Sequence, residues 1–231
     1  MAGLFITATD TGVGKTHIGC ALVRVVRQLG LPIDVFKPVE SGCLYDESGQ
    51  LWPADALALQ QAAGSQQPLE IICRYQFKTP LAPPEAARRE GRQLKLQDLI
   101  DACHPLQDRG AFTLVEGAGG LYSPIADDAL NIDLALALDL PMLLVCPDRL
   151  GTLSATLSAA ENIHRRGGQL AAVLLNERPL DRNITPRPDN AGALKHWLAT
   201  LLGKPVDVLA LREGFENSLP WQQACRRWAG L

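Results

Sequence analysis

The sequence predicts an α/β protein with a doubly wound, mostly parallel sheet and helices on both faces. Short apolar runs alternate with amphipathic stretches along the chain, with no internal repeat and no linker, and this alternation is typical of parallel sheets that helices cover on both sides. The run at 142–146 is apolar throughout, as expected of a strand in the middle of such a sheet. The chain has 231 residues, 47% of them hydrophobic, so we expect one large core and a single domain over residues 1–231.

Composition narrows the possible partners. The net charge is −3 and no stretch is rich in lysine or arginine, which argues against nucleic acid or a membrane as partner and favours a small molecule. The N-terminus enters a strand at once, and no apolar run has the length of a membrane span, so we expect a cytoplasmic protein. Six cysteines occur without a Cys-x-x-Cys pair, and we interpret them as reduced, packed thiols.

The first apolar run, residues 5–8, leads into a glycine-containing turn and then into a helix. This is the context of a phosphate-binding loop, in which backbone N–H groups surround the phosphates, a lysine reaches the outer phosphates and a threonine hydroxyl ligates magnesium. The usual motif has a further glycine five residues before Gly14, where this chain has Thr9. The alternative is a tight turn without a ligand. The sequence therefore predicts a P-loop NTPase-like fold whose nucleotide-binding residues include Gly12, Val13, Gly14, Lys15 and Thr16.

A helix is predicted behind this loop over 15–29, because apolar residues recur at helical spacing and Gly30 follows them. A short β-prone run at 33–36 then ends in Lys-Pro-Val-Glu-Ser-Gly. Polar residues at the carboxyl end of a parallel strand lie where open α/β sheets bind their ligands. Lys37 and Ser41 are therefore candidate site residues, with a surface lysine and a turn serine as the alternative.

The next stretch contains a second candidate metal ligand. Residues 44–52 are predicted to form a polar loop, and a helix follows from Ala54. Asp55 lies in the first turn of that helix, where a carboxylate is favoured by the helix dipole. It is therefore either a helix cap or a metal ligand. A proline-rich turn follows Thr79, and residues 94–106 are predicted to form an amphipathic helix without obvious chemistry.

A buried strand at 111–115 ends in an acidic residue followed by a glycine-rich segment. An acidic residue beside a phosphate loop can bind magnesium directly or through water, so Glu116 is a candidate metal ligand. Glycines after it would let the backbone approach a nucleotide closely. The alternative is an ordinary turn between a strand and a helix.

The remaining elements complete the predicted sheet. The strand at 142–146 is followed by a helix start at 150–154, whose free N–H groups are a candidate anion site. The later elements are, in order, a strand at 170–175 that ends at Asn176, a helix capped by Asp189 and Asn190, and a short strand at 206–209.

Four of these segments occur in the order of a known enzyme family. They are residues 9–16, 37–42, 55–57 and 115–120. Together they closely resemble the dethiobiotin synthetases, ATP-dependent enzymes that close the ureido ring in biotin synthesis. The resemblance extends to about Asn176 and includes the Arg-Leu-Gly sequence at 149–151.

The resemblance implies a role for each candidate residue. Lys15 and Lys37 would stabilise charge on the transferring phosphoryl group, and Thr11 and Ser41 would contact a carbamate. Magnesium would be held by Thr16, Asp55 and Glu116. The nucleotide would also contact the segment Gly117, Ala118 and Gly119, with adenine read by Asn176 and lined by the backbone of Val208, Leu209 and Ala210.

By the same resemblance, carbon dioxide adds to one amine of 7,8-diaminononanoate. The resulting carbamate attacks the γ-phosphate of ATP, and the second amine then displaces phosphate from the mixed anhydride to close the ring. In the family, the substrate carboxylate is received by a helix start of the partner subunit, which implies a two-fold homodimer with a shared active site. The matching residues in this chain are Gly151, Thr152, Leu153 and Ser154.

Two other functions fit parts of the sequence. An ATP-dependent amide synthetase of cobalamin biosynthesis is related, but the chain has no room for the glutaminase domain of those enzymes. A partitioning or cell-division switch ATPase of the ParA/MinD type has the loop sequence Lys-Gly-Gly-x-Gly-Lys-Thr, whereas Asp10 and Thr11 occupy its first two positions here. Acceleration of ATP hydrolysis by a diamine would separate the enzyme from the switch.

Overall fold

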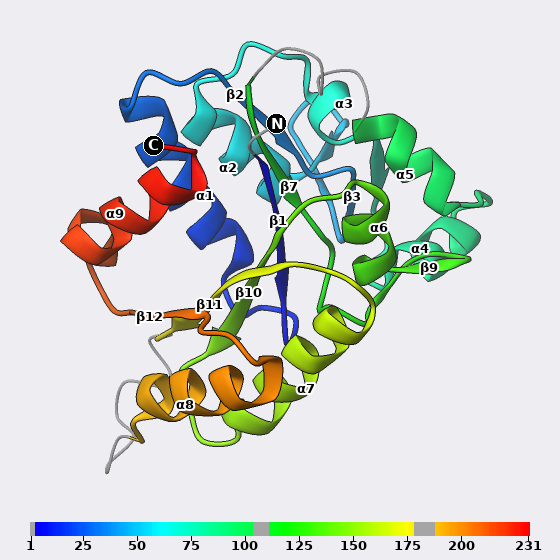
Figure 1. Cartoon of the computed structure of the whole chain (residues 1–231). Helices are drawn as coiled ribbons and strands as arrows, with labels where there is room; N and C mark the ends of the chain where they lie inside the picture. The colour runs from blue at the N-terminus through cyan, green and yellow to red at the C-terminus, as the bar shows by residue number, and fades with distance from the viewer. Residues whose placement is uncertain (1–2, 104–110, 178–187) are drawn as a thin grey trace.

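The computed structural model describes residues 3–103, 111–177 and 188–231 (Figure 1). Its central sheet has six strands in the order β12-β11-β10-β1-β7-β2, and every neighbouring pair is parallel. The carboxyl ends of all six strands therefore meet at one edge of the sheet, the edge where such folds bind ligands. The strands are β1 (Gly3–Ala8), β2 (Ile33–Phe36), β7 (Phe112–Glu116), β10 (Met142–Pro147), β11 (Leu170–Asn176) and β12 (Asp207–Leu211).

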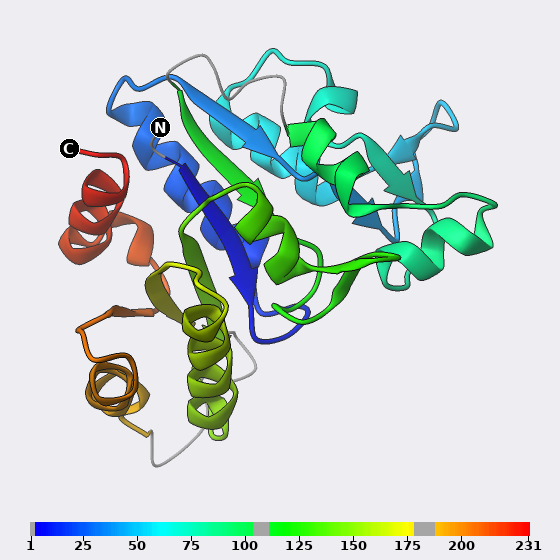
Figure 2. The same ribbon diagram turned by 45° about the vertical axis from the view of Figure 1, so that its right-hand side comes forward.

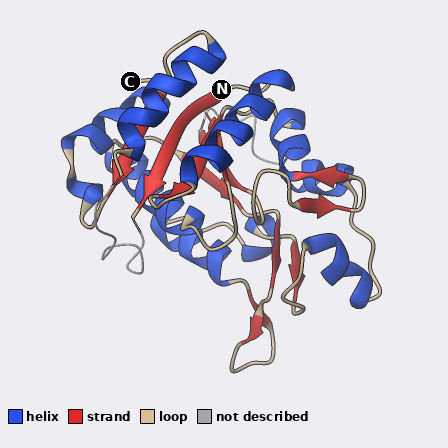
Figure 3. Ribbon diagram, turned by 90° about the horizontal axis from the view of Figure 1, so that it is seen from below, coloured by secondary structure: helices blue, strands red, loops and turns tan. Residues whose placement is uncertain are grey.

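Helices cover both faces of this sheet, as predicted (Figures 2 and 3). One face carries α1 (Lys15–Gln28), α2 (Ala54–Ala63), the short α3 (Leu69–Ile72) and α9 (Leu219–Trp228). The other face carries α5 (Leu96–Cys103), α6 (Asn131–Ala137), α7 (Thr152–Arg165) and α8 (Asn190–Leu202). Helix α4 (Pro83–Arg89) packs beyond the sheet, on the small strands at 39–41, 75–77 and 124–126. None of these helices is long and apolar enough to cross a membrane.

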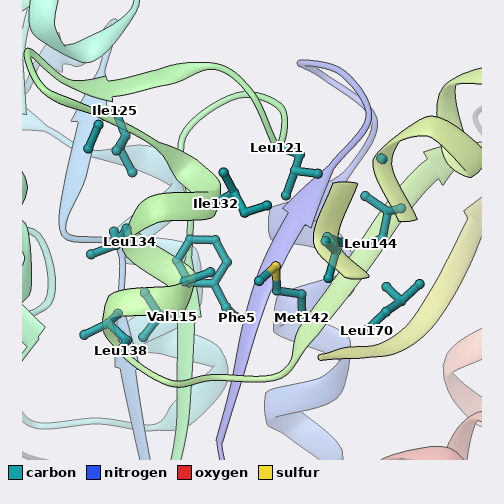
Figure 4. Close-up of a cluster of buried hydrophobic side chains, with 14 of the residues drawn as sticks. Phe5, Val115, Leu121, Ile125, Ile132, Leu134, Leu138, Met142, Leu144 and Leu170 are labelled. Atoms are coloured by element: carbon teal, nitrogen blue, oxygen red, sulfur yellow. The ribbon is translucent and has the colours of Figure 1, made fainter. Parts of the chain in front are cut away.

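Strand β1 supplies side chains to both hydrophobic cores, because successive residues of a strand point to opposite faces. Phe5 packs in one core and Ile6 in the other, and neither is exposed to solvent. Figure 4 shows Phe5 gathered with Val115 of β7 and Met142 of β10 near side chains of α6. With partners on both edges and both faces, β1 holds the loop that follows it in a fixed position.

Small elements at the carboxyl edge complete the fold. Strand β3 (Val39–Ser41) pairs in parallel with β6 (Tyr75–Phe77), and β8 (Pro124–Ala126) pairs with β9 (Ala129–Leu130). A 3₁₀ helix, η3 (Phe215–Asn217), precedes α9.

The prediction of a loop at 44–52 is wrong, because β4 (Leu44–Tyr45) and β5 (Leu51–Trp52) form a hairpin that projects from the body (Figure 2). The carboxylate of Asp46 accepts hydrogen bonds from the backbone N–H groups of Ser48 and Gln50 at 2.9 Å each. An aspartate that bonds to N–H groups further along the chain favours a tight turn.

Other predicted boundaries shift by a few residues. The helix predicted over 15–29 ends at Gln28, the strand predicted over 206–209 continues to Leu211, and the helix predicted over 94–106 spans Leu96–Cys103 up to the end of the described segment. Of the two predicted caps of α8, Asp189 is confirmed, since its carboxylate accepts from the Gly192 N–H at 2.9 Å. Asn190 is instead the first residue of the helix, and its amide donates to Asp148. All six cysteines are free and buried. The single domain remains a prediction.

Candidate active site

The loop between β1 and α1 is shaped to surround an anion. Gly12 and Gly14 have φ angles of 70° and 97°, a left-handed conformation that side chains other than glycine rarely adopt. A Cβ atom on Gly14 would also collide with the side-chain amide of Asn176. Helix α1 has no side-chain cap and no acidic residue in its first turn. Its first N–H groups and its dipole therefore favour an anion such as a phosphate group.

Lys37 follows β2 and reaches across the carboxyl edge to the end of β7. Its ammonium group donates to Glu116 Oε1 at 2.6 Å and to the Gly117 carbonyl at 3.0 Å, and it lies 3.4 Å from Asp55 Oδ2. Burial alone would lower the pKa of Lys37, but Glu116 and Asp55 outweigh it and hold the pKa above its usual value. Lys37 is thus a buried, charged ammonium group held between two carboxylates.

Lys15, the first residue of α1, lies close enough to Lys37 for the two charges to interact. Burial lowers its pKa, the neighbouring ammonium group of Lys37 lowers it further, and Glu116 and Asp55 oppose the shift. Two lysines that repel each other are readily accommodated if a polyanion binds between them. A triphosphate has the charge to do so.

The candidate metal ligands Thr16, Asp55 and Glu116 come from three elements, α1, α2 and β7. The Thr16 hydroxyl donates to Glu116 Oε1 at 2.8 Å, the same oxygen that binds Lys37. The described residues contain no group of three or more His, Cys, Asp or Glu side chains that could hold a metal ion. Two carboxylates and one hydroxyl are nevertheless a fitting donor set for Mg²⁺, which binds few protein oxygens and fills its remaining positions with water and substrate phosphates.

These groups line a cavity of about 430 Å³ at the carboxyl edge of the sheet. All four predicted catalytic residues border it, as do most of the predicted nucleotide-binding residues of the loop. The lining consists of Thr11, Gly12, Gly14, Lys15, Thr16, Lys37, Glu40, Ser41, Asp55, Glu116, Ala118 and Gly119.

A second cavity of about 400 Å³ adjoins the first and shares Thr11 and Ser41 with it. Its outer wall is the turn at 80–83, Pro-Leu-Ala-Pro, together with Ser123. Sequence reasoning identified this turn but gave it no role, because its side chains carry no chemistry. The first cavity thus has charged residues at the phosphate loop, and the adjoining cavity has mostly apolar residues at the turn.

The glycine-rich segment after β7 is held by Asn131, which sequence reasoning missed. The Asn131 side-chain amide donates to the carbonyls of Ala118, Gly120 and Ser123 at 2.6, 2.9 and 3.1 Å, and its oxygen accepts from the Ala118 N–H at 2.9 Å. A Cβ atom on Gly117 would collide with this amide. Because Ala118 and Gly119 border both cavities, Asn131 fixes a wall of the site.

The predicted carboxylate-binding residues lie outside both cavities of this chain. Gly151 precedes α7, and Thr152 begins it. Thr152 is buried, its hydroxyl lies 3.4 Å from that of Thr156, and its N–H donates to the Arg149 carbonyl at 3.2 Å. Thr152 therefore has neither a free N–H nor an exposed hydroxyl, whereas Ser154 is exposed.

The predicted adenine site lies at the ends of β11 and β12. Asn176 ends β11, and its side-chain amide donates to the Val13 carbonyl at 2.8 Å, which ties it to the phosphate loop. Within β12, however, Val208 packs in one core and Leu209 against the other. The residue paired with Asn176 across the strands is Leu211, so the rim beside Asn176 is formed by Leu211 and the residues after it, beyond the predicted Val208, Leu209 and Ala210.

The parallel sheet and the glycine loop at its carboxyl edge define a nucleotide-binding protein of the P-loop class. A family model described as an AAA domain matches residues 2–204. The ATP-dependent dethiobiotin synthetase of Anaeromyxobacter dehalogenans (strain 2CP-C) is 47% identical over 176 residues, which are 76% of this chain and 77% of the relative. The enzyme of the same name from Anaeromyxobacter sp. (strain K) is 45% identical over 85% of this chain and 86% of the relative. The chain belongs to the family of ATP-dependent dethiobiotin synthetases.

Solved structures agree on the fold. The MinC:MinD cell division protein complex of Aquifex aeolicus contains a chain that matches with a TM-score of 0.58, over 100% of this chain and 97% of that one. The sequence identity is 11%, so this likeness concerns the fold alone.

Proposed function

We propose that this protein is an ATP-dependent dethiobiotin synthetase, a ligase of biotin biosynthesis that closes the ureido ring on 7,8-diaminononanoate with carbon dioxide. The observation that carries the proposal is the buried Lys37 beside the phosphate loop. It is held within 3.4 Å of two carboxylates that border the same cavity. This arrangement supplies a fixed positive charge at the place where a phosphoryl group would transfer.

The reaction has three steps in this proposal. One substrate amine adds to carbon dioxide and loses a proton, which gives a carbamate. A carbamate oxygen attacks the γ-phosphorus of ATP and ADP leaves. The second amine then attacks the carbamate carbon, and phosphate leaves with the proton that this amine loses as the ring closes. ATP is needed because phosphorylation turns a poor leaving oxygen into a good one.

The chain's own residues would bind and orient the reactants. Lys15, Lys37 and the loop N–H groups would stabilise the phosphoryl charge, and Thr11 and Ser41, which border both cavities, would contact the carbamate. Thr16, Asp55 and Glu116 would hold Mg²⁺, which neutralises phosphate charge when bound. The base would lie beside Asn176, against the rim at Leu211 rather than the interior of β12.

The nine-carbon substrate also needs a place for its chain and its carboxylate. The apolar turn at 80–83 suits the chain, because it adjoins Thr11 and Ser41. We propose that the carboxylate is bound by the start of α7 of a second subunit in a two-fold homodimer. Free N–H groups at a helix N-terminus bind a carboxylate without a cationic side chain. Since the Thr152 N–H is already bonded, Leu153 and Ser154 would supply the donors. The protein would work in the cytoplasm, a location with which six free thiols are compatible.

One experiment tests the activity. The protein is incubated with Mg²⁺, ATP, bicarbonate and 7,8-diaminononanoate, and the cyclic urea is sought by mass spectrometry, with reactions lacking bicarbonate or diamine as controls. We expect the product only in the complete mixture, and phosphate release that depends on both omitted components. Phosphate release at the same rate with and without the diamine would contradict the proposal and favour a switch ATPase.

A further inference from the structure

Glu40 lies within the 37–42 motif, borders the larger cavity and is only 8% exposed. The proposed function gives it no role. We propose that Glu40 is a positioning residue: from a distant strand it caps the N-terminus of α2 and so fixes Asp55 in the magnesium site. This inference rests on the proposed function only for the role of Asp55.

Helix α2 lacks a cap of its own. Its N-cap residue is Pro53, and no side chain there accepts a hydrogen bond. A helix normally has its second or third N–H group satisfied by the side chain of its N-cap residue. Proline cannot do this, so α2 would begin with unsatisfied N–H groups, one of which belongs to the buried Ala56.

The carboxylate of Glu40 supplies the missing cap. Its Oε1 accepts from the Asp55 N–H and its Oε2 from the Ala56 N–H, each at 3.0 Å. These are the second and third residues of α2, the positions that an N-cap side chain normally serves. The negative charge also lies at the positive end of the helix dipole. Both oxygens of Glu40 are thus engaged in holding the first turn of α2.

Glu40 is itself fixed by the fold. It is the middle residue of β3 and pairs with Gln76 of β6, and its carbonyl accepts from the Cys43 thiol at 3.5 Å. The next residue, Ser41, borders both cavities. Adjacent residues of β3 therefore have two proposed roles: Glu40 caps the helix that carries Asp55, and Ser41 contacts the substrate.

Asp55 depends on this cap more than the other two metal ligands do. Glu116 lies at the end of a central strand, and Thr16 lies in α1, which is packed on the sheet. The side chain of Asp55 is 45% exposed and is positioned by the first turn of α2. If that turn frays, the Asp55 carboxylate moves while Thr16 and Glu116 remain in place. The predicted effect is a higher magnesium requirement without loss of the fold.

The first measurement is made on the full chain without nucleotide or metal. Glu40→Ala should speed amide hydrogen exchange in the first turn of α2. The rate should rise roughly 2- to 30-fold if Glu40 stabilises the turn as much as a typical N-cap side chain does. The second measurement titrates Mg²⁺ against binding of a fluorescent ATP analogue. The concentration for half-maximal binding should rise by a similar factor, and saturating Mg²⁺ should restore binding.

Two further variants isolate the cap. Glu47→Ala removes an exposed carboxylate from the neighbouring hairpin and should change neither measurement. Pro53→Ser in the Glu40→Ala background places a hydroxyl at the N-cap position, where the backbone is already extended, and should recover both values in part. If Glu40→Ala fails to fold, Glu40→Gln keeps one acceptor and should give intermediate values.

Unchanged exchange in Glu40→Ala would overturn the proposal, as would an equal effect of Glu47→Ala. A Pro53→Ser rescue that restores neither exchange nor the magnesium titration would also overturn it, because a local cap would then not replace Glu40. If exchange responds as expected while the wild-type protein shows no magnesium dependence, the cap stands and the proposed magnesium site fails.

Discussion

Lys37 contacts both carboxylates of the proposed magnesium site. Its ammonium group lies between Glu116 and Asp55, and its side chain is 4% exposed. We expect Lys37→Ala and Lys15→Ala each to lower kcat by about 10²–10³, on the order of 2.7–4 kcal/mol, as when a fixed electrostatic contact to a transition state is removed. Diamine-dependent phosphate release measures this effect. Lys78→Ala, which removes an exposed lysine, is the control and should keep full turnover.

Removal of Lys37 also leaves Glu116 as a buried carboxylate without its cationic partner. Breaking a buried ion pair by truncating one partner destabilises a protein strongly, whereas replacing both partners costs much less. Thermal unfolding should therefore show a lower midpoint for Lys37→Ala and partial recovery for Lys37→Ala/Glu116→Gln, without recovery of turnover. Full turnover in Lys37→Ala would refute its catalytic role.

Asp55 has two possible roles that one substitution separates. Its backbone N–H belongs to the capped first turn of α2, whereas its carboxylate faces Lys37. Asp55→Asn keeps the backbone and the size of the side chain but removes the charge. We expect a higher magnesium requirement for ATP-dependent turnover and a thermal midpoint close to that of the wild type. An unchanged magnesium titration would contradict the role of Asp55 as a metal ligand. Its carboxylate would then act only through its favourable interaction with the helix dipole.

At the scale of elements, the segment after β7 depends on one side chain of α6. Asn131 makes four hydrogen bonds to that segment and is fully buried. Asn131→Ala removes the side-chain partner of the Ala118 N–H and carbonyl, at about 1–3 kcal/mol for each group left buried and unsatisfied. The carbonyls of Gly120 and Ser123 keep bonds from the backbone N–H groups of Ser123 and residue 131. We expect a lower thermal midpoint together with weaker binding of ATP and diamine. Asn162→Ala, whose amide bonds only to a carbonyl of its own helix, should leave both unchanged. A destabilised Asn131→Ala protein with unaltered substrate affinity would show that the segment does not need this support.

At the scale of the whole molecule, the features that could be predicted from the sequence are those that depend on residues close together in the chain. The strand, glycine turn and helix around Lys15 could be predicted because their motif is contained in a short segment of the chain. The strand order of the sheet then places Lys37 and Glu116 beside this segment. Glu40 was missed because its partners lie 15 and 16 residues away and no spacing rule connects a strand residue to a distant helix start. Asn131 was missed for the same reason. The hairpin at 44–52 was missed because its exposed apolar residues show no alternation.

The length of β12 shows another limit of sequence reasoning. A short apolar run predicted its centre, but its end is set by pairing with β11, where Leu211 lies opposite Asn176. Pairing partners in a parallel sheet are distant in sequence, so the strand end could not be read from β12 alone. The adenine wall predicted at Val208, Leu209 and Ala210 stays a prediction, and the strand continues one residue beyond it, to Leu211.

The proposed homodimer can be tested by combining two defective subunits. Ser154→Glu places a negative charge at the start of α7, which stabilises the helix by its dipole but repels a substrate carboxylate. We expect weak diamine binding in this variant with ATP binding retained. Ser158→Glu, one turn further along the same helix and also exposed, should behave as wild type.

If the start of α7 serves the partner's site, Lys37→Ala and Ser154→Glu subunits complement each other. Because each mixed two-fold dimer then contains one intact site, equal random mixing should restore about a quarter of the wild-type sites. Ring closure measured after co-refolding gives this fraction. No recovery, or a fully active monomer in sedimentation, would refute the shared site.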